Sequence, residues 1–348
     1  MSEDHIDLSK TPHDDPRPAD HYSRSTADVP PALPLHKVTT AADMIKEQLR
    51  KVIIGQEDYV DLLLVALLTK GHVLVEGVPG IAKTLTAKLM AQTLDTEFSR
   101  IQFTPDLMPS DVIGSTVFNM QTSDFTFNKG PIFSNIVLID EINRAPAKTQ
   151  AALFEVMEET QVTADGHTYS LTDPFFVIAT QNPIEQEGTY KLPEAQLDRF
   201  LFRVLLSYPT LEDEKAILRR FRTDFSQTVT EQVKPVFDGK DIAEVRDIVE
   251  RIRITDDLLD YIAQIVHDTR NNPDLYLGAS PRAGLAMMKS AKAVAALNAR
   301  DFVTPDDIRY VSYPVLNHRV ILTPEREMEG TETREIIDDI IKKIEVPR

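Results

Sequence analysis

The stretch HVLVEGVPGIAKTLTAKLM, residues 72–90, decides how the first part of this chain folds. It begins with the short apolar run HVLVE, which is typical of a buried strand, and ends in TLTAKLM, where apolar residues have helical spacing. Between them lies a glycine-containing turn that ends at Lys83 and Thr84. A strand, a loop and a helix in this order are the setting of a phosphate-binding loop, in which backbone N–H groups and the helix N-terminus attract anions.

The loop departs from the usual phosphate-binding pattern at one position. That pattern places a glycine directly before the lysine, whereas this loop opens at Gly77 and has Ala82 before Lys83. We expect Ala82 to lie at the helix start, away from the positions that demand a positive φ, so that alanine is tolerated there. Lys83 would then reach the β and γ phosphates of a nucleotide, and the Thr84 hydroxyl would bind Mg²⁺. The alternative is a glycine-rich turn that precedes a helix by chance.

Four further short apolar runs follow, each bounded by turn residues or charges. They are FSRIQF (98–103), NIVLID (135–140), PFFVIAT (174–180) and FLFRVLL (200–206). Helical segments separate them. Apolar strands that alternate with helices predict an α/β fold, in which a parallel sheet is covered by helices on both faces.

The chain divides into three regions by composition. Residues 1–35 are polar, contain prolines and have few large apolar side chains, which predicts a flexible tail. Residues 36–208 carry the alternating strands and helices. Residues 209–348 are mostly helical in pattern, and Ser280-Pro281 and Thr304-Pro305 predict two helix starts because proline favours the first helical turn.

The overall composition limits the classes of partner. The formal net charge is −17, so we expect the protein to repel nucleic acid and anionic membranes. The densest basic run, at Arg219, Arg220 and Arg222, has the character of a solvated helix face. The chain contains no cysteine, no apolar run long enough for a membrane span and no signal-peptide pattern at its start, so a cytoplasmic location without membrane insertion is expected.

Polar residues follow two of the expected strands at the edge where ligands bind in such sheets. Asp140 and Glu141 follow the apolar residues 136–139, and Asn182 follows the run that ends at Thr180. Asp140 would hold Mg²⁺, Glu141 would polarise the attacking water, and Asn182 would orient that water or the γ-phosphate. The alternatives are an ordinary polar strand end for the two carboxylates and a plain Asn-Pro turn for Asn182.

Two arginines lie at positions where we expect an anionic partner. Arg199 follows a short helical segment just before the last strand, and it is either a surface ion-pair partner or an arginine finger offered to a neighbouring subunit. Arg282 lies in the first turn of the helix that starts at Ser280, where the helix dipole disfavours a positive charge. We expect Arg282 to face a nucleotide rather than a salt-bridge partner.

With these residues assembled, the chain resembles AAA+ ATPases, and specifically the MoxR family. The resemblance covers about residues 38–323. It is carried by the segments VIIGQE (52–57), EGVPGIAKT (76–84), IQFTPDLMPSDVIG (101–114), GPIFSN (130–135), LIDEINRAPAKTQAALFEVMEE (138–159), ATQNPIEQEGTYKLPEAQLDRF (179–200) and GASPRA (278–283). Alanine before the loop lysine is familiar in this family and in the related MCM helicases.

The resemblance implies an αβα sandwich with a five-stranded parallel sheet, a helical lid domain, and assembly into a homo-oligomeric ring, usually a hexamer. It implies that ATP and Mg²⁺ are the cofactors. It assigns the Walker B role to Asp140 and Glu141, sensor 1 to Asn182, the arginine finger to Arg199 and sensor 2 to Arg282, without deciding whether Arg282 acts in cis or in trans. The nucleotide-binding residues expected are Gly77, Val78, Pro79, Gly80, Ile81, Ala82, Lys83, Thr84 and Leu85, with Thr84 and Asp140 at the metal.

The resemblance also implies two insertions that face protein clients. QTSDFTFNKG (121–130) fits a loop inserted in the second helix, and the segment around Asp165-Gly166 fits a hairpin. MoxR-type ATPases resemble chaperones that remodel or mature partners, often proteins with a von Willebrand factor type A domain. Two other functions stay open: a nucleic-acid motor like the MCM relatives, which the acidic charge opposes, and an ATP-gated scaffold with slow turnover.

Overall fold

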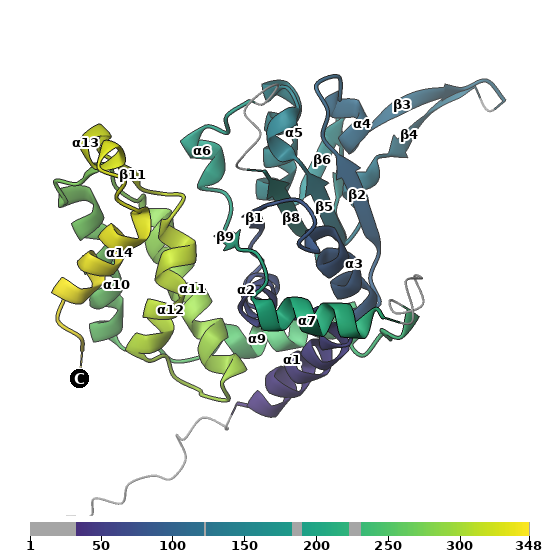
Figure 1. Cartoon of the computed structure of the whole chain (residues 1–348). Coiled ribbons are helices and arrows are strands. Elements are labelled where there is room, and N and C mark those ends of the chain that lie inside the picture. The colour runs from purple at the N-terminus through teal and green to yellow at the C-terminus, as the bar shows by residue number, and fades with distance from the viewer. Residues whose placement is uncertain (1–32, 122, 183–189, 223–230, 348) are drawn as a thin grey trace, which may run out of the picture. The chain divides into compact units, whose positions relative to one another are not determined.

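A computed structural model of the chain describes residues 33–121, 123–182, 190–222 and 231–347 (Figure 1). The tail predicted over residues 1–35 lies almost entirely outside these ranges. The first described helix, α1, begins at Leu35. Part of the segment 179–200 that carries the family resemblance, residues 183–189, also lies outside them.

A parallel five-stranded sheet forms the centre of the first part of the chain, as predicted, with the strand order β2-β5-β8-β1-β9. Its strands are β1 (Val73–Gly77), β2 (Phe98–Gln102), β5 (Ile136–Asp140), β8 (Phe176–Gln181) and β9 (Phe202–Leu206). The inner strands β1 and β5 are buried throughout, whereas the edge strands β2 and β9 are partly exposed. The inner strands therefore read as continuous apolar runs, because both faces of a parallel sheet are covered.

Helices cover both faces of this sheet. The helices around it are α1 (Leu35–Arg50), α2 (Glu57–Leu68), α3 (Lys83–Thr93), α4 (Pro109–Ile113), α5 (Ala147–Glu159) and α6 (Glu194–Leu197). Alternate residues of one strand face different cores: Val73 and Val75 pack in the cluster that contains α1, α2 and α3, and Leu74 packs in the cluster that contains α5. This alternation produces the αβα sandwich.

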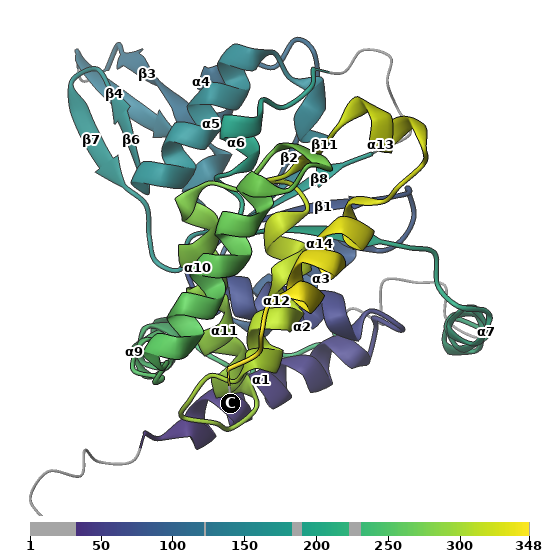
Figure 2. The same cartoon turned by 90° about the vertical axis from the view of Figure 1, so that its left-hand side faces the viewer.

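Two antiparallel hairpins extend from the sheet domain. In one, β6 (Gln161–Ala164) pairs with β7 (His167–Ser170) around Asp165 and Gly166, whose φ angles of 50° and 77° fit the predicted two-residue turn. In the other, β3 (Gly114–Asn119) pairs with β4 (Asp124–Lys129). The expectation of a loop over 121–130 was therefore wrong in form, since cross-strand pairing orders most of that segment; both hairpins are labelled in Figure 2.

The second part of the chain is mainly helical. Its elements are α7 (Leu211–Arg220), η4 (Gly239–Asp241), α9 (Ile242–Glu250), α10 (Asp256–Asn271), α11 (Pro281–Leu297), α12 (Pro305–Leu316), α13 (Pro324–Met328) and α14 (Thr333–Lys343). The helices α11 and α12 begin at the two prolines as predicted. A two-stranded ribbon, β10 (Leu275–Leu277) with β11 (Ile321–Leu322), was not predicted, because its strands are too short to show a period. None of the helices in the described ranges combines the length and apolar character that crossing a membrane requires.

The helical region packs directly on the sheet domain. The helices α10, α11, α12 and α14 lie together (Figures 1 and 2), and α12 contacts β9 while α11 contacts α2. Buried residues from α1 to α3 and from α9 to α12 belong to one continuous hydrophobic cluster. Residues 33–348 accordingly form one compact unit.

Candidate nucleotide site

The loop after β1 is shaped by its own side chains. The ammonium group of Lys83, the first residue of α3, donates to the carbonyl of Gly77 at 2.7 Å, which closes the loop. From the start of α2, Gln56 donates its Nε2 to the carbonyl of Ile81 at 2.8 Å. Gly77 is required sterically, because a Cβ there would lie 2.9 Å from the carbonyl oxygen of Leu206 on β9.

The backbone of Ala82 differs from the prediction. Its φ of 60° and ψ of 19° lie in the left-handed region, and α3 begins only at the following lysine. The expectation that Ala82 escapes a positive φ was therefore wrong. The glycine usual at this position of the motif adopts a positive φ without strain. Alanine adopts the same backbone conformation at a cost on the order of 1 kcal/mol.

Partial burial and nearby carboxylates both affect the pKa of the Lys83 ammonium group. Partial removal from water lowers the pKa of its ammonium group, and the carboxylates of Asp140, Glu141 and Glu76 oppose that shift. The three nearby carboxylates favour the charged form, but the desolvation of the half-buried group outweighs them. An ammonium group in this state gains most when an additional anion binds beside it.

Asp140 and Thr84 meet at the carboxyl edge of the sheet. The Thr84 hydroxyl donates to Oδ2 of Asp140 at 3.4 Å, and the Thr180 hydroxyl donates to Oδ1 at 2.7 Å. Among the described residues, no group of three or more His, Cys, Asp or Glu side chains could hold a metal ion. The pair nevertheless fits Mg²⁺, which takes hard oxygen ligands and commonly binds one carboxylate together with substrate phosphates.

Glu141 occupies a strained backbone position directly after β5. Its φ is 57°, in the left-handed region that a residue with a side chain rarely adopts. Gln102 donates to its Oε2 at 2.7 Å, and Arg144 forms an ion pair with the same carboxylate at 3.0 Å. These contacts fix the direction of the carboxylate at the sheet edge.

Two polar residues on β2 were missed in the sequence. Arg100 contacts Oδ2 of Asp140 with Nε at 2.8 Å, and Gln102 contacts Glu141. The available signal was their spacing of two on a strand, which puts both side chains on one face, opposite Leu138 and Asp140 of β5. Asn182 is buried directly after β8, the neighbour of β5, so it reaches the same edge as the two carboxylates.

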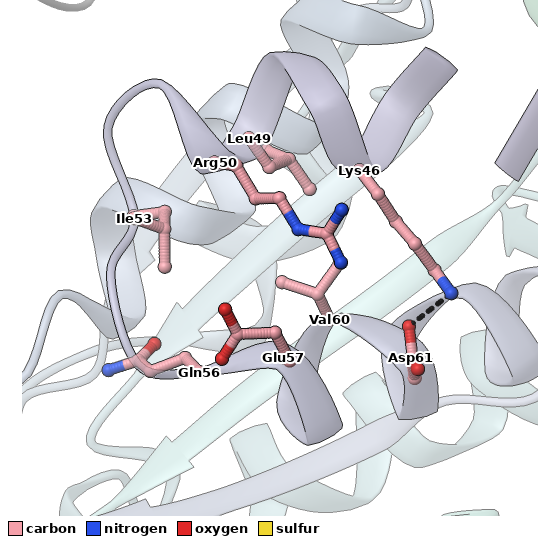
Figure 3. A pocket seen from close by; sticks show the side chains of 8 residues that line it. All are labelled: Lys46, Leu49, Arg50, Ile53, Gln56, Glu57, Val60 and Asp61. Carbon is pink, nitrogen blue, oxygen red and sulfur yellow. Dashed lines mark ion pairs between the residues drawn. The ribbon is translucent and has the colours of Figure 1, made fainter. Parts of the chain in front are cut away.

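Two cavities that are both lined by Gln56 and Glu57, at the start of α2, differ greatly in size. A cavity of about 390 Å³ lies between the start of α2 and the end of β9, and Ile54, Gly55, Tyr208 and Asp213 are among its lining residues. A second cavity, between α1 and α2, has only about 20 Å³, and the ion pair of Lys46 with Asp61 lies on its wall (Figure 3). Only the first has the volume that part of a nucleotide needs.

Arg199 and Arg282 lie together but away from the loop. Both pair with the carboxylate of Glu158, near the end of α5: Arg199 through Nη1, and Arg282 through Nη2 at 2.8 Å. Arg199 also donates to the carbonyl of Phe154 at 2.8 Å. A cavity of about 250 Å³ is lined by all three charged side chains together with Asp198 and Arg319. The structure therefore gives Arg282 a salt-bridge partner, whereas the sequence favoured a nucleotide at this position.

The two arginines and the loop lie at opposite ends of the parallel strands: the arginines at the amino end and the loop at the carboxyl end. β1 and β9 are parallel, with Val73 beside Phe202 and Gly77 beside Leu206. Arg199 precedes the start of β9, whereas the loop follows the end of β1. Five strand residues at about 3.3 Å each separate the two ends by roughly 16 Å. Glu158 was not predicted, because nothing near it in the sequence reveals that it bridges two distant arginines.

Comparison with known proteins agrees with this geometry. The protein family described as "ATPase family associated with various cellular activities (AAA)" matches residues 72–202. The family described as "AAA lid domain" matches residues 267–340. The uncharacterized protein YeaC of Bacillus subtilis is 48% identical over 86% of this chain and 93% of its own length. Chaperone MoxR1 of Mycobacterium tuberculosis is 40% identical over 86% of this chain and 81% of its own length.

A solved structure has the same fold. The crystal structure of a protein from Cytophaga hutchinsonii superposes with a TM-score of 0.83 at 43% sequence identity, and covers 90% of this chain and 97% of that one. Protein MoxR of Paracoccus denitrificans is 30% identical over 80% of this chain and 88% of its own length. The chain therefore belongs to the MoxR family of AAA ATPases, a membership that implies hydrolysis of ATP.

Proposed function

We propose that this ATPase works as a ring-shaped chaperone, in which ATP bound at the carboxyl edge of one subunit is hydrolysed with help from the arginines of the next. The observation that carries this proposal is the separation of the parts. Lys83, Thr84 and Asp140 lie at the carboxyl end of the strands, and Arg199 and Arg282 lie at the amino end. Within one subunit the two sets lie apart, and a ring in which the arginines of one subunit face the loop of the next would bring them to a single phosphate.

The carboxyl edge supplies the binding part of the site. The backbone of residues 77–82 and the N-terminus of α3 would hold the β and γ phosphates, with Lys83 as the counter-charge. Mg²⁺, held by Thr84 and through water by Asp140, would neutralise charge on the phosphates. The 390 Å³ cavity between the start of α2 and the end of β9 offers room for the nucleoside, with apolar contact from Ile54 and Tyr208.

Glu141 is proposed as the residue that activates water. Its carboxylate would accept a proton as the water oxygen forms a bond to the γ-phosphorus. The bond from that phosphorus to the bridging oxygen breaks, and ADP leaves with the electron pair. Asn182 would orient the water or the γ-phosphate, and the two arginines from the adjacent subunit would stabilise charge on the transferring group.

An exposed hairpin supports protein as the client. On β3 and its turn, Val117, Phe118 and Met120 are exposed by 47%, 48% and 87%, and Phe125 on β4 is exposed by 68%. The rings of Phe118 and Phe125 meet edge to face at 5.1 Å. The hairpin projects from the sheet domain (Figure 1), and exposed apolar groups on such a projection suit a surface that binds polypeptide. Proteins with a von Willebrand factor type A domain are the client class that the family relationship favours.

The alternative of a nucleic-acid motor has less support. The net charge is −17, and the β6–β7 turn carries Asp165, Gly166 and His167 but no lysine or arginine. Backbone phosphates are usually contacted by such basic residues. A DNA-binding measurement at two salt concentrations checks this alternative, which requires affinity that falls steeply with salt.

The substitution Glu141→Gln tests the proposed function. The amide cannot accept the proton, so the variant should bind ATP, assemble and hydrolyse at least ~10²-fold more slowly. It should then hold its client, which pull-down from native cells and mass spectrometry identifies; capture of nucleic acid instead would overturn the chaperone proposal. Phosphate release by the wild type with and without that client separates a working ATPase from a slow ATP-gated scaffold.

A further inference from the structure

Three consecutive side chains after α12 contact the segment that carries Arg199. Asn317 donates Nδ2 to the carbonyl of Arg203 at 2.9 Å, and the His318 ring contacts the carbonyl of Phe200 at 3.1 Å. Arg319 binds the same segment and is the most engaged of the three. The nucleotide site described above gives none of them a role. All three are buried, which is costly for polar side chains unless every group is paired.

Arg319 satisfies this condition completely. A guanidinium has five N–H donors, and the structure provides five acceptors. Nε donates to Oδ1 of Asp198 at 2.6 Å. The other acceptors are the carbonyls of Asp198 (3.0 Å), Phe200 (2.6 Å), Leu201 (3.2 Å) and Val315 (2.5 Å). The Arg319 side chain is only 3% exposed, so this fan of contacts is shielded from water.

Asp198 extends these contacts to the helix that carries the second arginine. Its Oδ2 accepts from the Ser280 hydroxyl at 2.9 Å. Ser280 is the N-cap of α11, and its hydroxyl oxygen in turn accepts from the backbone N–H of Arg282 at 3.2 Å. Asp198 is itself the chain neighbour of Arg199. The Asp198 carboxylate therefore connects the backbone segment that carries Arg199 with the start of α11, which carries Arg282.

We propose that Asp198 and Arg319 are positioning residues that hold Arg199 of the sheet domain and Arg282 of the helical region as one unit, so that both reach the same nucleotide on the adjacent subunit. This inference rests on the proposed function, which supplies the intersubunit site. Neither residue touches the nucleotide. They contribute by fixing the distance between the side chains of Arg199 and Arg282, which come from segments more than eighty residues apart.

The physical reason is the precision that phosphoryl transfer needs. An error of about 1 Å in the placement of a reacting or stabilising group can cost on the order of 10² in rate. Two guanidinium groups also repel each other, and Glu158 offsets this repulsion only at the ends of the side chains. The buried contacts of Arg319 fix the backbones beneath them.

Arg319→Lys and Asp198→Asn test the proposal. Lysine keeps the charge but has three donors, so at least two of the five acceptors lose their partner. We expect each variant to bind ATP with unchanged affinity and to lose at least ~10-fold in kcat. Arg246→Lys is the matched control: Arg246 is another buried arginine, bound to the carbonyl of Leu67 and to Asp173, without contact to either arginine of the site. It should lower stability but keep the rate per folded molecule.

A mixing experiment separates positioning from general damage. Arg319→Lys subunits keep an intact loop, and Lys83→Ala subunits keep intact arginines, so mixed rings should regain activity. A structural defect in Arg319→Lys that reached its own nucleotide site would prevent this recovery. The mixture of Arg199→Ala with Lys83→Ala runs alongside: recovery there but not with Arg319→Lys overturns the positioning role alone, whereas recovery in neither overturns the intersubunit site. Unchanged kcat in both folded variants would also contradict the inference.

Discussion

The hydroxyl of Thr84 donates to Oδ2 of Asp140 at 3.4 Å, although 56 positions separate the two residues in the chain. Thr84 stands in the first turn of α3, and Asp140 ends β5. Parallel strands bring them to the same edge of the sheet. The hydroxyl and the carboxylate are two hard oxygen groups beside the loop that Lys83 closes, and oxygen groups of this kind suit the Mg²⁺ that the proposed function calls for.

Lys83→Ala is expected to abolish ATP binding, because it removes the only ammonium group that the loop itself contributes next to the bound phosphates. Equilibrium titration with a fluorescent ATP analogue measures the effect. Lys88→Ala is the matched control, since Lys88 lies on the same helix with its side chain exposed, and it should bind like the wild type. Unchanged affinity in a folded Lys83→Ala protein would remove the basis for the nucleotide site.

Substitutions at Ala82 test the left-handed backbone. Glycine adopts a φ of 60° without strain, so Ala82→Gly should keep ATPase activity within a few-fold of the wild type. Ala82→Val should damage activity, because a β-branched side chain is a true outlier at positive φ and would force the loop open. Steady-state phosphate release compares the three proteins. A fully active valine variant would mean that the loop tolerates a different backbone there.

The sheet and most helices could be predicted because their signals are local. The five apolar runs became the five strands, and the prolines at 281 and 305 marked two helix starts. Ala82 shows the limit of that reasoning. The sequence identifies a helix start, but the φ of the residue before it depends on how the loop closes through Lys83 and Gln56.

The partners of the site could not be predicted for a related reason. Arg100 on β2 reaches Asp140 on the neighbouring strand β5, 40 positions later in the chain, and Glu158 meets Arg282 over 124 positions of sequence. Such pairs depend on tertiary packing, which leaves no periodic trace in the chain. Arg319 is similar: as a sequence it is one arginine after a helix, and only the fold reveals five acceptors around it.

A buried histidine predicts the pH dependence of stability. His72 lies inside the sheet domain, where its ring contacts the carbonyl of Met157 at 3.2 Å and accepts from the N–H of Val177 at 3.1 Å. Burial lowers its pKa from 6.5 to about 4. Between these two pH values the unfolded chain binds a proton that the folded protein does not, so the free energy of unfolding falls as the pH falls. The loss from His72 should approach roughly 3 kcal/mol at pH 4.

Urea unfolding at several pH values between 7 and 4 measures this loss. His72→Gln removes the titrating ring and should flatten the pH dependence, although its stability at pH 7 will be lower. His267→Gln serves as the comparison, because it makes the same substitution at a histidine whose side chain is 66% exposed. An identical slope in the His72 variant would show that this residue does not cause the effect. Burial also lowers the pKa of His318, so part of the slope should remain.

The most direct test of the account is to mix Arg199→Ala with Lys83→Ala and measure ATP hydrolysis. Each variant alone should lose at least ~10² in rate, the first because the transferring phosphate lacks its arginine and the second because ATP is not held. In mixed rings, some interfaces combine the intact loop of an Arg199→Ala subunit with the intact Arg199 of a Lys83→Ala subunit. Activity should therefore partly return. A simple surface ion pair at Arg199 would instead contribute about 0–1 kcal/mol to stability and leave turnover near normal. Absence of recovery in rings proven to contain both variants would contradict an active site shared between subunits.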